Sequence, residues 1–301
     1  MAGALRLATR GSPLARRQTE LVQARLRAAM PDLEIQVVVV ETLGDARTDV
    51  PLREISGRGV FTTEVDQAVL IGRADVAVHS AKDLPSATEV AGLVLAAIPE
   101  RADVRDVLVG STLNALAQGA PVATGAPRRR VQLAHLRPDL TFVEVRGNIG
   151  TRLGKVPNGG ALVVALAALE RLAIAERATE ILPVDVMLPQ VGQGAIALRC
   201  LAEDRSTRSL LKQIDSPDAH RAVTAERAFL ARLGGGCDAP VGGYATIGAD
   251  RLVHLEAMIA APDASTVIRR RGVGPDAAEV GTSLAESMLE IDGAAELFGL
   301  S

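Results

Sequence analysis

The sequence predicts an α/β protein of two or three domains, and three observations lead to this expectation. Short apolar segments rich in valine, leucine and alanine alternate along the chain with helical segments, which is the pattern of strand–helix units. The 301 residues exceed the usual size of a single hydrophobic core. Hydrophobic residues make up 48% of the chain but aromatic residues only 2%, so the cores are expected to be aliphatic.

The first strand–helix unit contains a candidate anion site. Leu5–Thr9 predicts a short strand, and Ser12 followed by Pro13 is a favourable start for the next helix. The free backbone N–H groups at such a helix start attract anions, and Arg10 and Ser12 lie beside them. An ordinary capped helix explains this segment equally well.

The rest of the first unit continues the alternation. Glu34–Glu41 contains four valines and predicts a buried strand. Ser56–Phe61 is a glycine-rich loop that leads into a helix over Thr62–Ile71. Asp75–His79 is again apolar and predicts a second buried strand.

Polar and charged residues follow this second strand directly. Ser80, Lys82 and Asp83 come at its carboxyl end, which is where open α/β sheets bind their ligands. Adjacent opposite charges are more often a solvated surface pair. The position after an apolar strand nevertheless favours a functional role for Lys82 and Asp83.

A second unit begins near Pro99 and gathers arginines after its strands. Strands are expected at Asp106–Val109, Pro121–Thr124, Thr141–Val145 and Ala161–Val164. The arginines that follow them are Arg128, Arg129, Arg146, Arg152 and Arg171. Guanidinium groups bind carboxylates and phosphates through paired hydrogen bonds, so this set indicates an anionic ligand. For the triplet Arg128–Arg130 alone, a basic surface at a helix start is the favoured interpretation.

The chain then returns toward its first unit. Leu188–Ala195 is interpreted as this crossing, and its Gly-x-Gly is too short for a dinucleotide-binding fingerprint. A helix over Asp218–Leu233, strands near 252–258 and 266–270, and a final helix from about Pro275 complete a small C-terminal α/β part.

The loop Leu233–Pro240 is the most distinctive segment of the chain. Three glycines precede Cys237 and leave its thiol open to a bulky group. The other cysteine, Cys200, follows an apolar run and is expected at a buried strand end. For a lone cysteine, an incidental surface thiol is the commoner interpretation, so the role of Cys237 depends on the remaining residues.

Composition excludes several classes of protein. A net charge of −3 argues against a surface that binds nucleic acid. The first ten residues lack the apolar core of a secretory signal, and the longest apolar run, Ala161–Leu169, is too short to span a bilayer. Two cysteines form no disulfide framework. We therefore expect a soluble cytoplasmic protein.

Five motifs occur in order along the chain: Ala8-Thr-Arg-Gly-Ser12, Val78-His-Ser-Ala-Lys-Asp-Leu-Pro85, Arg146-Gly-Asn-Ile-Gly-Thr-Arg152, Leu188-Pro-Gln-Val-Gly-Gln-Gly-Ala195 and Gly235-Gly-Cys237. Together they resemble the hydroxymethylbilane synthase, or porphobilinogen deaminase, family. The resemblance covers nearly the whole chain. It implies two periplasmic-binding-protein-like domains of type II joined by a hinge, plus a small C-terminal α+β domain. The implied domains are residues 1–98 with 194–215, residues 99–193, and residues 216–301.

The resemblance also implies a transferase reaction. Four porphobilinogen molecules are joined head to tail with release of ammonia, which gives the linear tetrapyrrole hydroxymethylbilane for heme and porphyrin biosynthesis. The implied cofactor is dipyrromethane, held to Cys237 by a thioether. No metal, nucleic acid or membrane partner is implied, and the enzyme is expected to be a monomer.

The resemblance assigns roles to individual residues. Asp83 is the catalytic carboxylate and Lys82 assists it. The implied cofactor contacts are Ser80, Lys82, Asp83, Thr124, Arg128 and Arg129. The implied contacts to porphobilinogen and the growing oligopyrrole are Arg10, Ser12, Phe61, Arg146, Arg152, Arg171 and Gln193.

One motif departs from the family pattern. Ala123-Thr-Gly-Ala-Pro127 stands where the family usually shows Gly-Thr-Ser-Ser and an aliphatic residue. A serine-mediated cofactor contact therefore does not carry over to Gly125 or Ala126.

Two other functions remain as alternatives. A solute-binding module would explain the arginines without catalysis, but it leaves the Cys237 loop without a purpose. A cysteine hydrolase needs a general base beside the thiol. The sequence places none of its four histidines there: His79, His135, His220 and His254.

Overall fold

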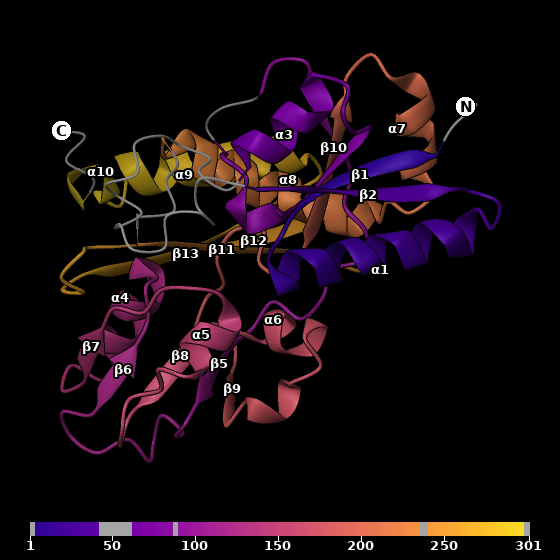
Figure 1. The fold of residues 1–301 in the computed structure, drawn as a ribbon. Coiled ribbons are helices and arrows are strands. Elements are labelled where there is room, and N and C mark those ends of the chain that lie inside the picture. Colours follow the sequence, from indigo (N-terminus) through magenta and orange to yellow (C-terminus); the bar gives the residue numbers. More distant parts are fainter. Residues whose placement is uncertain (1–3, 42–61, 87–89, 235–239, 298–301) are drawn as a thin grey trace. The chain divides into compact units, whose positions relative to one another are not determined.

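The computed structural model describes residues 4–41, 62–86, 90–234 and 240–297 (Figure 1). The chain divides into two compact units. The first comprises Met1–Ala102 with Ala195–His220, and the second comprises Asp103–Gly194 with Arg221–Ser301.

The first unit is built on a five-stranded sheet of order β2-β1-β3-β10-β4. Its strands are β1 Leu5–Arg10, β2 Ile35–Val40, β3 Val76–Ser80, β4 Leu93–Ala97 and β10 Ile196–Leu201. β1 runs parallel to β2 and β3, whereas β10 is antiparallel to β3 and β4. β10 therefore returns to the first sheet after the strands of the second sheet, which confirms the crossing predicted at 188–195.

Helices cover both faces of this sheet (Figure 1). The helices are α1 Pro13–Ala29, α3 Thr63–Leu70 and α7 Arg205–Lys212. Leu7 and Leu198 pack on Val22 of α1, and Ala77 packs on Val65 of α3. α1 and α3 therefore cover opposite faces of the sheet. As predicted, α1 begins at an N-cap Ser12, whose side chain accepts a hydrogen bond from Ala15 N, with Pro13 at the first helical position.

One strand was expected to be buried and is not. β2 lies at the edge of the sheet, and Val37 and Val39 are 41% and 43% exposed. A run of valines favours a strand through its β-branched side chains whether or not both faces are covered. The run therefore identified the strand correctly but not its burial.

The second unit contains a sheet of corresponding order, β7-β6-β8-β5-β9, in which β5 takes the place of β10. Its strands are β5 Asp106–Val109, β6 Pro121–Ala123, β7 Thr141–Val143, β8 Ala161–Ala165 and β9 Glu180–Leu182. Its helices are α4 Pro127–Leu136, α5 Ile149–Leu153 and α6 Leu166–Arg171. β6, β7 and β8 are parallel, and β5 is antiparallel to β8 and β9, as β10 is to β3 and β4. The two sheets confirm the predicted pair of periplasmic-binding-protein-like α/β folds.

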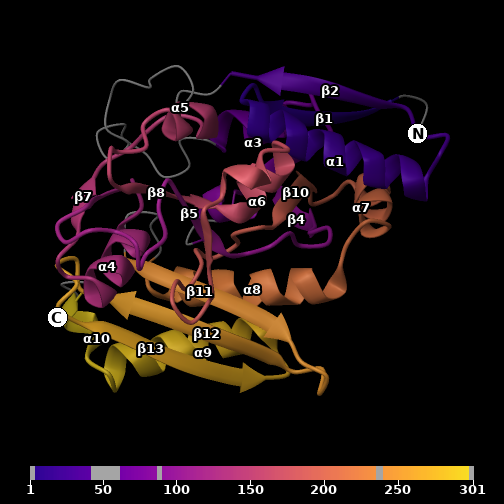
Figure 2. The ribbon, with the colours of Figure 1, turned by 90° about the horizontal axis from the view of Figure 1, so that it is seen from below.

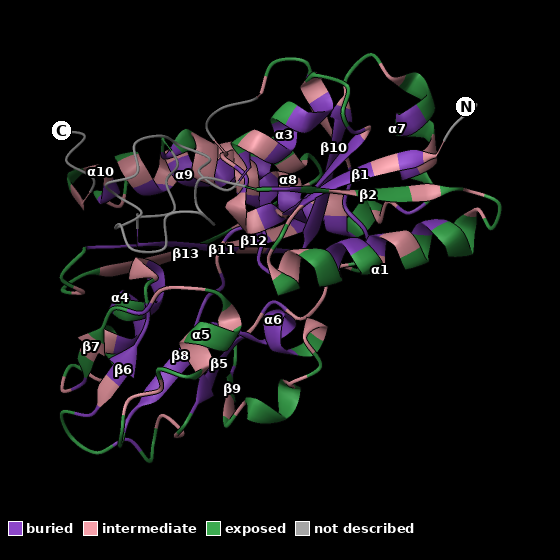
Figure 3. Cartoon of the chain, viewed as in Figure 1, coloured by how far each residue is buried: buried purple, intermediate pink, exposed green. Residues whose placement is uncertain are grey.

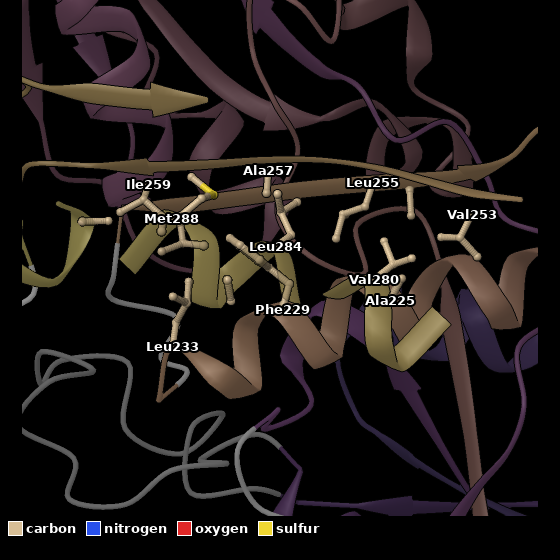
Figure 4. Packing of buried hydrophobic residues seen from close by; sticks show 14 of the residues in the cluster. Ala225, Phe229, Leu233, Val253, Leu255, Ala257, Ile259, Val280, Leu284 and Met288 are labelled. Atoms are coloured by element: carbon tan, nitrogen blue, oxygen red, sulfur yellow. The ribbon is translucent and has the colours of Figure 1, made fainter. Parts of the chain in front are cut away.

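The C-terminal part is a three-stranded antiparallel meander covered by helices (Figure 2). It comprises β11 Val241–Ile247, β12 Val253–Ala260, β13 Val267–Gly274, α8 Pro217–Arg232, α9 Ala277–Glu290 and α10 Ala294–Leu297. Phe229, Leu255 and Leu284 lie in its hydrophobic core (Figure 4). Most residues of β12 are buried (Figure 3). The predicted helix 218–233, the two predicted strands and the final helix are all present. The division into three domains at 98, 193 and 215 stays a prediction.

Candidate active site

The carboxyl end of β3 forms the first part of the candidate site. After Ser80 the chain makes a 3-10 turn over Ala81–Asp83, which is closed by a hydrogen bond from Leu84 N to Ala81 O at 3.3 Å. Ala81 N donates to Ala195 O at 3.0 Å, so the turn remains tied to the sheet. The backbone that carries Lys82 and Asp83 is therefore fixed by main-chain hydrogen bonds.

Asp83 has an unusual environment for a half-buried carboxylate. Among the described residues, no hydrogen bond or ion pair holds its side chain. Carboxylates of similar burial normally have a partner, because desolvation without one is costly. The Asp83 carboxylate is thus available to N–H groups of a ligand.

Three other predicted residues lie near this edge of the sheet. β1 and β3 are parallel, so Arg10 at the end of β1 and Ser12 at the start of α1 share the edge with Ser80–Asp83. The Ser80 hydroxyl is held by the amide of Gln18, whose Nε2 donates to Ser80 Oγ at 2.8 Å. The Ser12 hydroxyl serves as the helix cap, so its binding role stays a prediction.

The second unit also brings its predicted residues to one sheet edge. Thr124, Arg128 and Arg129 follow β6, Arg146 and Arg152 follow β7, and Arg171 follows β8. Because these three strands are parallel, their carboxyl ends face the same side of the unit. The arginines that the sequence singled out therefore share one edge.

Arg128 and Arg129 do not form a basic surface. They are 3% and 5% exposed, and both donate to Asp106 at the start of β5, over 2.7 and 2.8 Å. The interpretation of the triplet as a surface helix start is wrong for these two residues, although Arg130 is exposed. β5 is antiparallel to β8, so Asp106 at its start lies at the same sheet edge as the end of β6.

The charges in this cluster shape its titration. Burial alone would raise the pKa of Asp106, but attraction to Arg128 and Arg129 and their hydrogen bonds outweigh it and hold the pKa well below its ordinary range. Burial also lowers the pKa of Arg128, against the stabilising attraction of Asp106. Two guanidinium groups share one carboxylate, so the cluster has an excess of positive charge.

The cluster fits a ligand that carries carboxylates. The Nε atoms of Arg128 and Arg129 are buried and find no hydrogen-bond partner within the described ranges. Gln193 joins the cluster through its Nε2, which donates to Asp106 Oδ1 at 2.8 Å and to Val104 O at 2.7 Å. Excess positive charge with unused donors suits the acetate and propionate groups of a dipyrromethane.

The remaining arginines each donate a hydrogen bond to an acceptor in the second unit. Arg146 Nε donates to Glu144 Oε1 at 2.8 Å, Arg152 Nε to Gly147 O at 2.8 Å, and Arg171 Nη2 to Gly194 O at 2.7 Å. Each of these bonds uses one nitrogen of the guanidinium fork. The Thr124 hydroxyl accepts a hydrogen bond from Ala126 N at 3.2 Å and is buried.

Two predicted site residues, Phe61 and Cys237, lie outside the described residues. The segment with Cys237 joins the end of α8 at Arg232 to the start of β11 at Val241. The other cysteine, Cys200, is fully buried in β10 as predicted, and burial raises the pKa of its thiol to about 11. Cys200 is therefore a structural residue.

Several buried polar residues were not predicted. Asp106 begins an apolar strand, and that position is the only sequence signal of its role. Gln18 lies in the middle of a helix, and Glu226 accepts hydrogen bonds from Gly192 N and Ala245 N at 2.7 and 2.8 Å. Partners so distant along the chain give no local pattern.

The Thr124–Pro127 turn passes close to the segment after β7. A Cβ at Gly125 would lie 2.8 Å from Val145 O, a backbone atom that cannot move aside cheaply. A side chain at residue 125 would therefore require one of the two segments to shift.

The described ranges contain no helix long and apolar enough to cross a membrane. They also contain no group of three or more His, Cys, Asp or Glu side chains arranged for a metal ion.

Comparisons with known proteins agree along the whole chain. The family model "Porphobilinogen deaminase, dipyromethane cofactor binding domain" matches residues 5–209, and the model of the porphobilinogen deaminase C-terminal domain matches residues 220–290. A porphobilinogen deaminase of Roseiflexus castenholzii is 46% identical over 305 residues, which cover 99% of this chain and all of that protein. A porphobilinogen deaminase of Acidothermus cellulolyticus is 47% identical over 296 residues, covering 95% of this chain and 88% of that protein.

Solved structures give more distant likenesses. A TRAP periplasmic solute binding protein from Desulfovibrio salexigens has a TM-score of 0.41 at 12% identity, covering 70% of this chain and 71% of that chain. The reduced regulatory domain of OxyR from Pseudomonas aeruginosa has a TM-score of 0.37 at 14% identity, covering 70% and 96%.

Proposed function

Because the chain belongs to the porphobilinogen deaminase family, it condenses porphobilinogen into hydroxymethylbilane, and we propose that Asp83 carries the chemistry of that reaction. The observation that supports this role is a half-buried carboxylate without a partner in the described structure, on a backbone fixed at the ligand edge of a sheet. A carboxylate that no described group engages is open to the N–H groups of a substrate.

The chemistry requires a negative charge at this position. Loss of ammonia from porphobilinogen breaks a C–N bond and leaves an electron-poor azafulvene, which the free α-carbon of the preceding pyrrole attacks. A proton is then lost from that carbon and the pyrrole is restored. Positive charge develops on pyrrole nitrogens before and after the attack, and an ionised Asp83 next to those N–H groups stabilises it. The same carboxylate can accept or return protons during both steps.

Dipyrromethane is the cofactor of this family, and it supplies the first pyrrole α-carbon to which substrate is joined. We assign its attachment to the Cys237 sulfur. We propose that the residues that would hold its carboxylates are Arg128, Arg129, Thr124, Ser80 and Lys82. The buried Arg128–Arg129–Asp106 cluster supports this assignment because it is preorganised and carries excess positive charge.

The growing oligopyrrole adds an acetate and a propionate with every unit. Arg10, Arg146, Arg152 and Arg171 would offset this charge, with Ser12, Phe61 and Gln193 as further contacts. We assign the enzyme to the cytoplasm and to a monomeric state. Light scattering of the purified protein tests the second assignment, and a stable dimer mass would contradict it.

Substitution of Asp83 tests the proposed catalytic role. Asp83→Asn preserves shape and one acceptor but removes the charge, so we expect turnover to fall by about 10²–10³, or roughly 3–4 kcal/mol in the barrier. Asp83→Glu should retain part of the activity. Turnover of folded, cofactor-loaded variants is the measurement, and near-normal turnover in the Asn variant would remove Asp83 from the mechanism.

Mass mapping tests the attachment site. The peptide containing Cys237 should carry two deaminated porphobilinogen units in active enzyme, whereas the Cys200 peptide should be unmodified because its thiol is buried. An unmodified Cys237 in active enzyme would contradict the assignment, whereas an unmodified Cys237 in a chain that binds ligand without turnover would favour a binding module.

A further inference from the structure

A buried polar network lies directly behind the end of β3. Asp66 in α3 accepts a hydrogen bond from His79 Nε2 in β3 at 2.9 Å and another from Arg199 Nη1 in β10 at 2.8 Å. Each oxygen of the carboxylate thus serves one partner. Asp66, His79 and Arg199 are 2%, 4% and 7% exposed.

The sheet register places these residues on one face. His79 stands opposite Ala197, and Arg199 stands opposite Ala77, so all four side chains point toward α3. The two alanines leave room for the histidine and the arginine beneath the helix. The network therefore joins three elements, α3, β3 and β10, at one layer of the unit.

The network contributes little to the stability of the fold. Desolvating an ion pair is expensive, and aliphatic residues of similar volume commonly serve a core as well or better. The hydrophobic residues of this layer are aliphatic and include Val65 and Val69 of α3 and Ala8 of β1. The network does fix orientation, because its hydrogen bonds hold the His79 ring and the strand that carries it in place.

His79 lies next to the residues that lead into the candidate site. His79 precedes Ser80, whose side chain points to the opposite face and is held there by Gln18. Both faces of the last two residues of β3 are thus clamped by buried polar groups. The turn that bears Lys82 and Asp83 begins at the next residue, Ala81.

We propose that Asp66, through His79 and Arg199, is a positioning residue for Asp83. The network holds the end of β3 in one register against β10 and α3, so that the Asp83 carboxylate, which no side chain of the described ranges engages, meets its substrate in one orientation. The proposal rests on the catalytic role of Asp83 proposed above. Displacing a reacting group by about 1 Å can cost up to about 100-fold in rate, so a small shift of this strand end is enough to matter.

Asp66→Asn tests the proposal, with Asp75→Asn as the matched control. Asp75 precedes the same strand at its other end, where it accepts hydrogen bonds from Arg6 N at 2.7 Å, Nε at 3.1 Å and Nη2 at 2.6 Å. Both variants lose one ionic partner of an arginine on a neighbouring strand. We expect both to lower the denaturant midpoint, but only Asp66→Asn to lower kcat, by about 10- to 100-fold, with KM within about twofold of wild type.

Equal kcat in the two variants, compared at equal folded fraction and equal cofactor loading by intact mass, would overturn the proposal. If Asp66→Asn does not fold, Arg199→Lys gives the second test. It keeps a cation beside Asp66 but loses the planar guanidinium, so kcat should fall by about 3- to 10-fold. A normal kcat in folded Arg199→Lys would also overturn the proposal.

A double variant separates this proposal from the catalytic role of Asp83. If Asp66 acts by aiming Asp83, then Asp66→Asn combined with Asp83→Asn should be no slower than Asp83→Asn alone. A further loss of the full single-variant size would show that Asp66 acts elsewhere. Near-normal turnover in Asp83→Asn alone would instead contradict the proposed function and leave the effect of Asp66 to be measured independently.

Discussion

At the scale of single residues, Asp106 shows how a buried charge can be maintained. Its carboxylate is fully buried and accepts hydrogen bonds from Arg128, Arg129 and Gln193. Removing one member of such a cluster leaves the others desolvated without compensation, which costs far more than the intact cluster contributes. Asp106 is therefore required for the two arginines to remain buried beneath the candidate binding edge.

Asp106→Asn should destabilise the second unit by about 3–5 kcal/mol at neutral pH, because two guanidinium groups lose their counter-charge. The folded-state pKa of Asp106 lies below its unfolded value, so its contribution to stability is present above about pH 4 and is lost as the pH falls toward the folded pKa. Urea unfolding of wild type and variant from pH 7 to pH 3 measures both effects.

The difference in unfolding free energy between wild type and Asp106→Asn should therefore be constant at neutral pH and shrink below about pH 4. Asp250→Asn, at an exposed carboxylate of the C-terminal meander, is the control and should change stability little. A difference that grows on acidification would contradict the lowered pKa of Asp106.

Residue-level prediction from the sequence worked where the cause is local. Ser12 was recognised as a cap because its hydroxyl bonds a backbone N–H three residues away. Cys200 was recognised as buried from the apolar residues beside it. The pairing of Arg128 with Asp106 could not be recognised, because 22 residues and two strands separate the partners and only the tertiary fold brings them together.

At the scale of elements, most strands and helices followed from periodicity, and β11 shows why some did not. Its sequence contains Gly242 and Gly243, which are typical of a turn. In the structure these glycines allow close packing: a Cβ at Gly242 would lie 3.2 Å from Leu188 O and Pro189 O, and one at Gly243 would lie 3.1 Å from Val191. The strand is glycine-rich because the 188–194 segment crosses against it.

The crossing of α8 and α9 gives an element-scale prediction. A Cβ at Gly281 would lie 2.2 Å from Ala225 O and 2.7 Å from Phe229 N, both backbone atoms of α8. Gly281→Ala should gain about 1 kcal/mol in helix propensity but lose more through separation of the helices, with a net destabilisation of about 1–3 kcal/mol. Thermal or urea unfolding measures the change.

Ser283→Ala, at an exposed position two residues further along α9, is the matched control for this substitution. It adds helix propensity without a steric contact, so it should leave stability unchanged or slightly raised. A stabilised Gly281→Ala variant would mean that α8 and α9 are not held at the distance the structure shows.

At the scale of the whole molecule, two sheets with the same strand order arise from a chain without a visible internal repeat. In both, three parallel strands lie beside an antiparallel strand, β10 in one sheet and β5 in the other. The sequence predicted the return of the chain through 188–195, and the family resemblance implied two domains of one type. No internal repeat showed the shared order, because layer packing constrains only which faces are apolar and not which residues make them so. The same freedom explains why Arg128 and Arg129 were located but not their burial.

Charge over the whole molecule explains why the remaining arginines matter. The chain carries a net charge of −3, yet its product gains an acetate and a propionate with every added pyrrole. Nothing in the overall charge attracts such a product, so local arginines must supply the compensation. Arg146 and Arg152, at the carboxyl edge of the second sheet, flank the short helix α5 that Asn148 caps.

Arg146→Leu and Arg152→Leu should therefore leave the fold intact and slow elongation. Losing one charge-assisted contact should cost about 2–3 kcal/mol in binding, enough to stall one or more additions. Arg177→Leu is the matched control, since Arg177 is exposed in the same unit and lies outside the proposed site. Intact-mass analysis during single turnover measures the number of pyrroles on the enzyme. Partly elongated species should accumulate in the first two variants and not in the control. Elongation to the full tetrapyrrole requires that a guanidinium group binds the carboxylates at each stage. Identical elongation in all three variants would show that these arginines belong to the surface and that other groups offset the charge of the product.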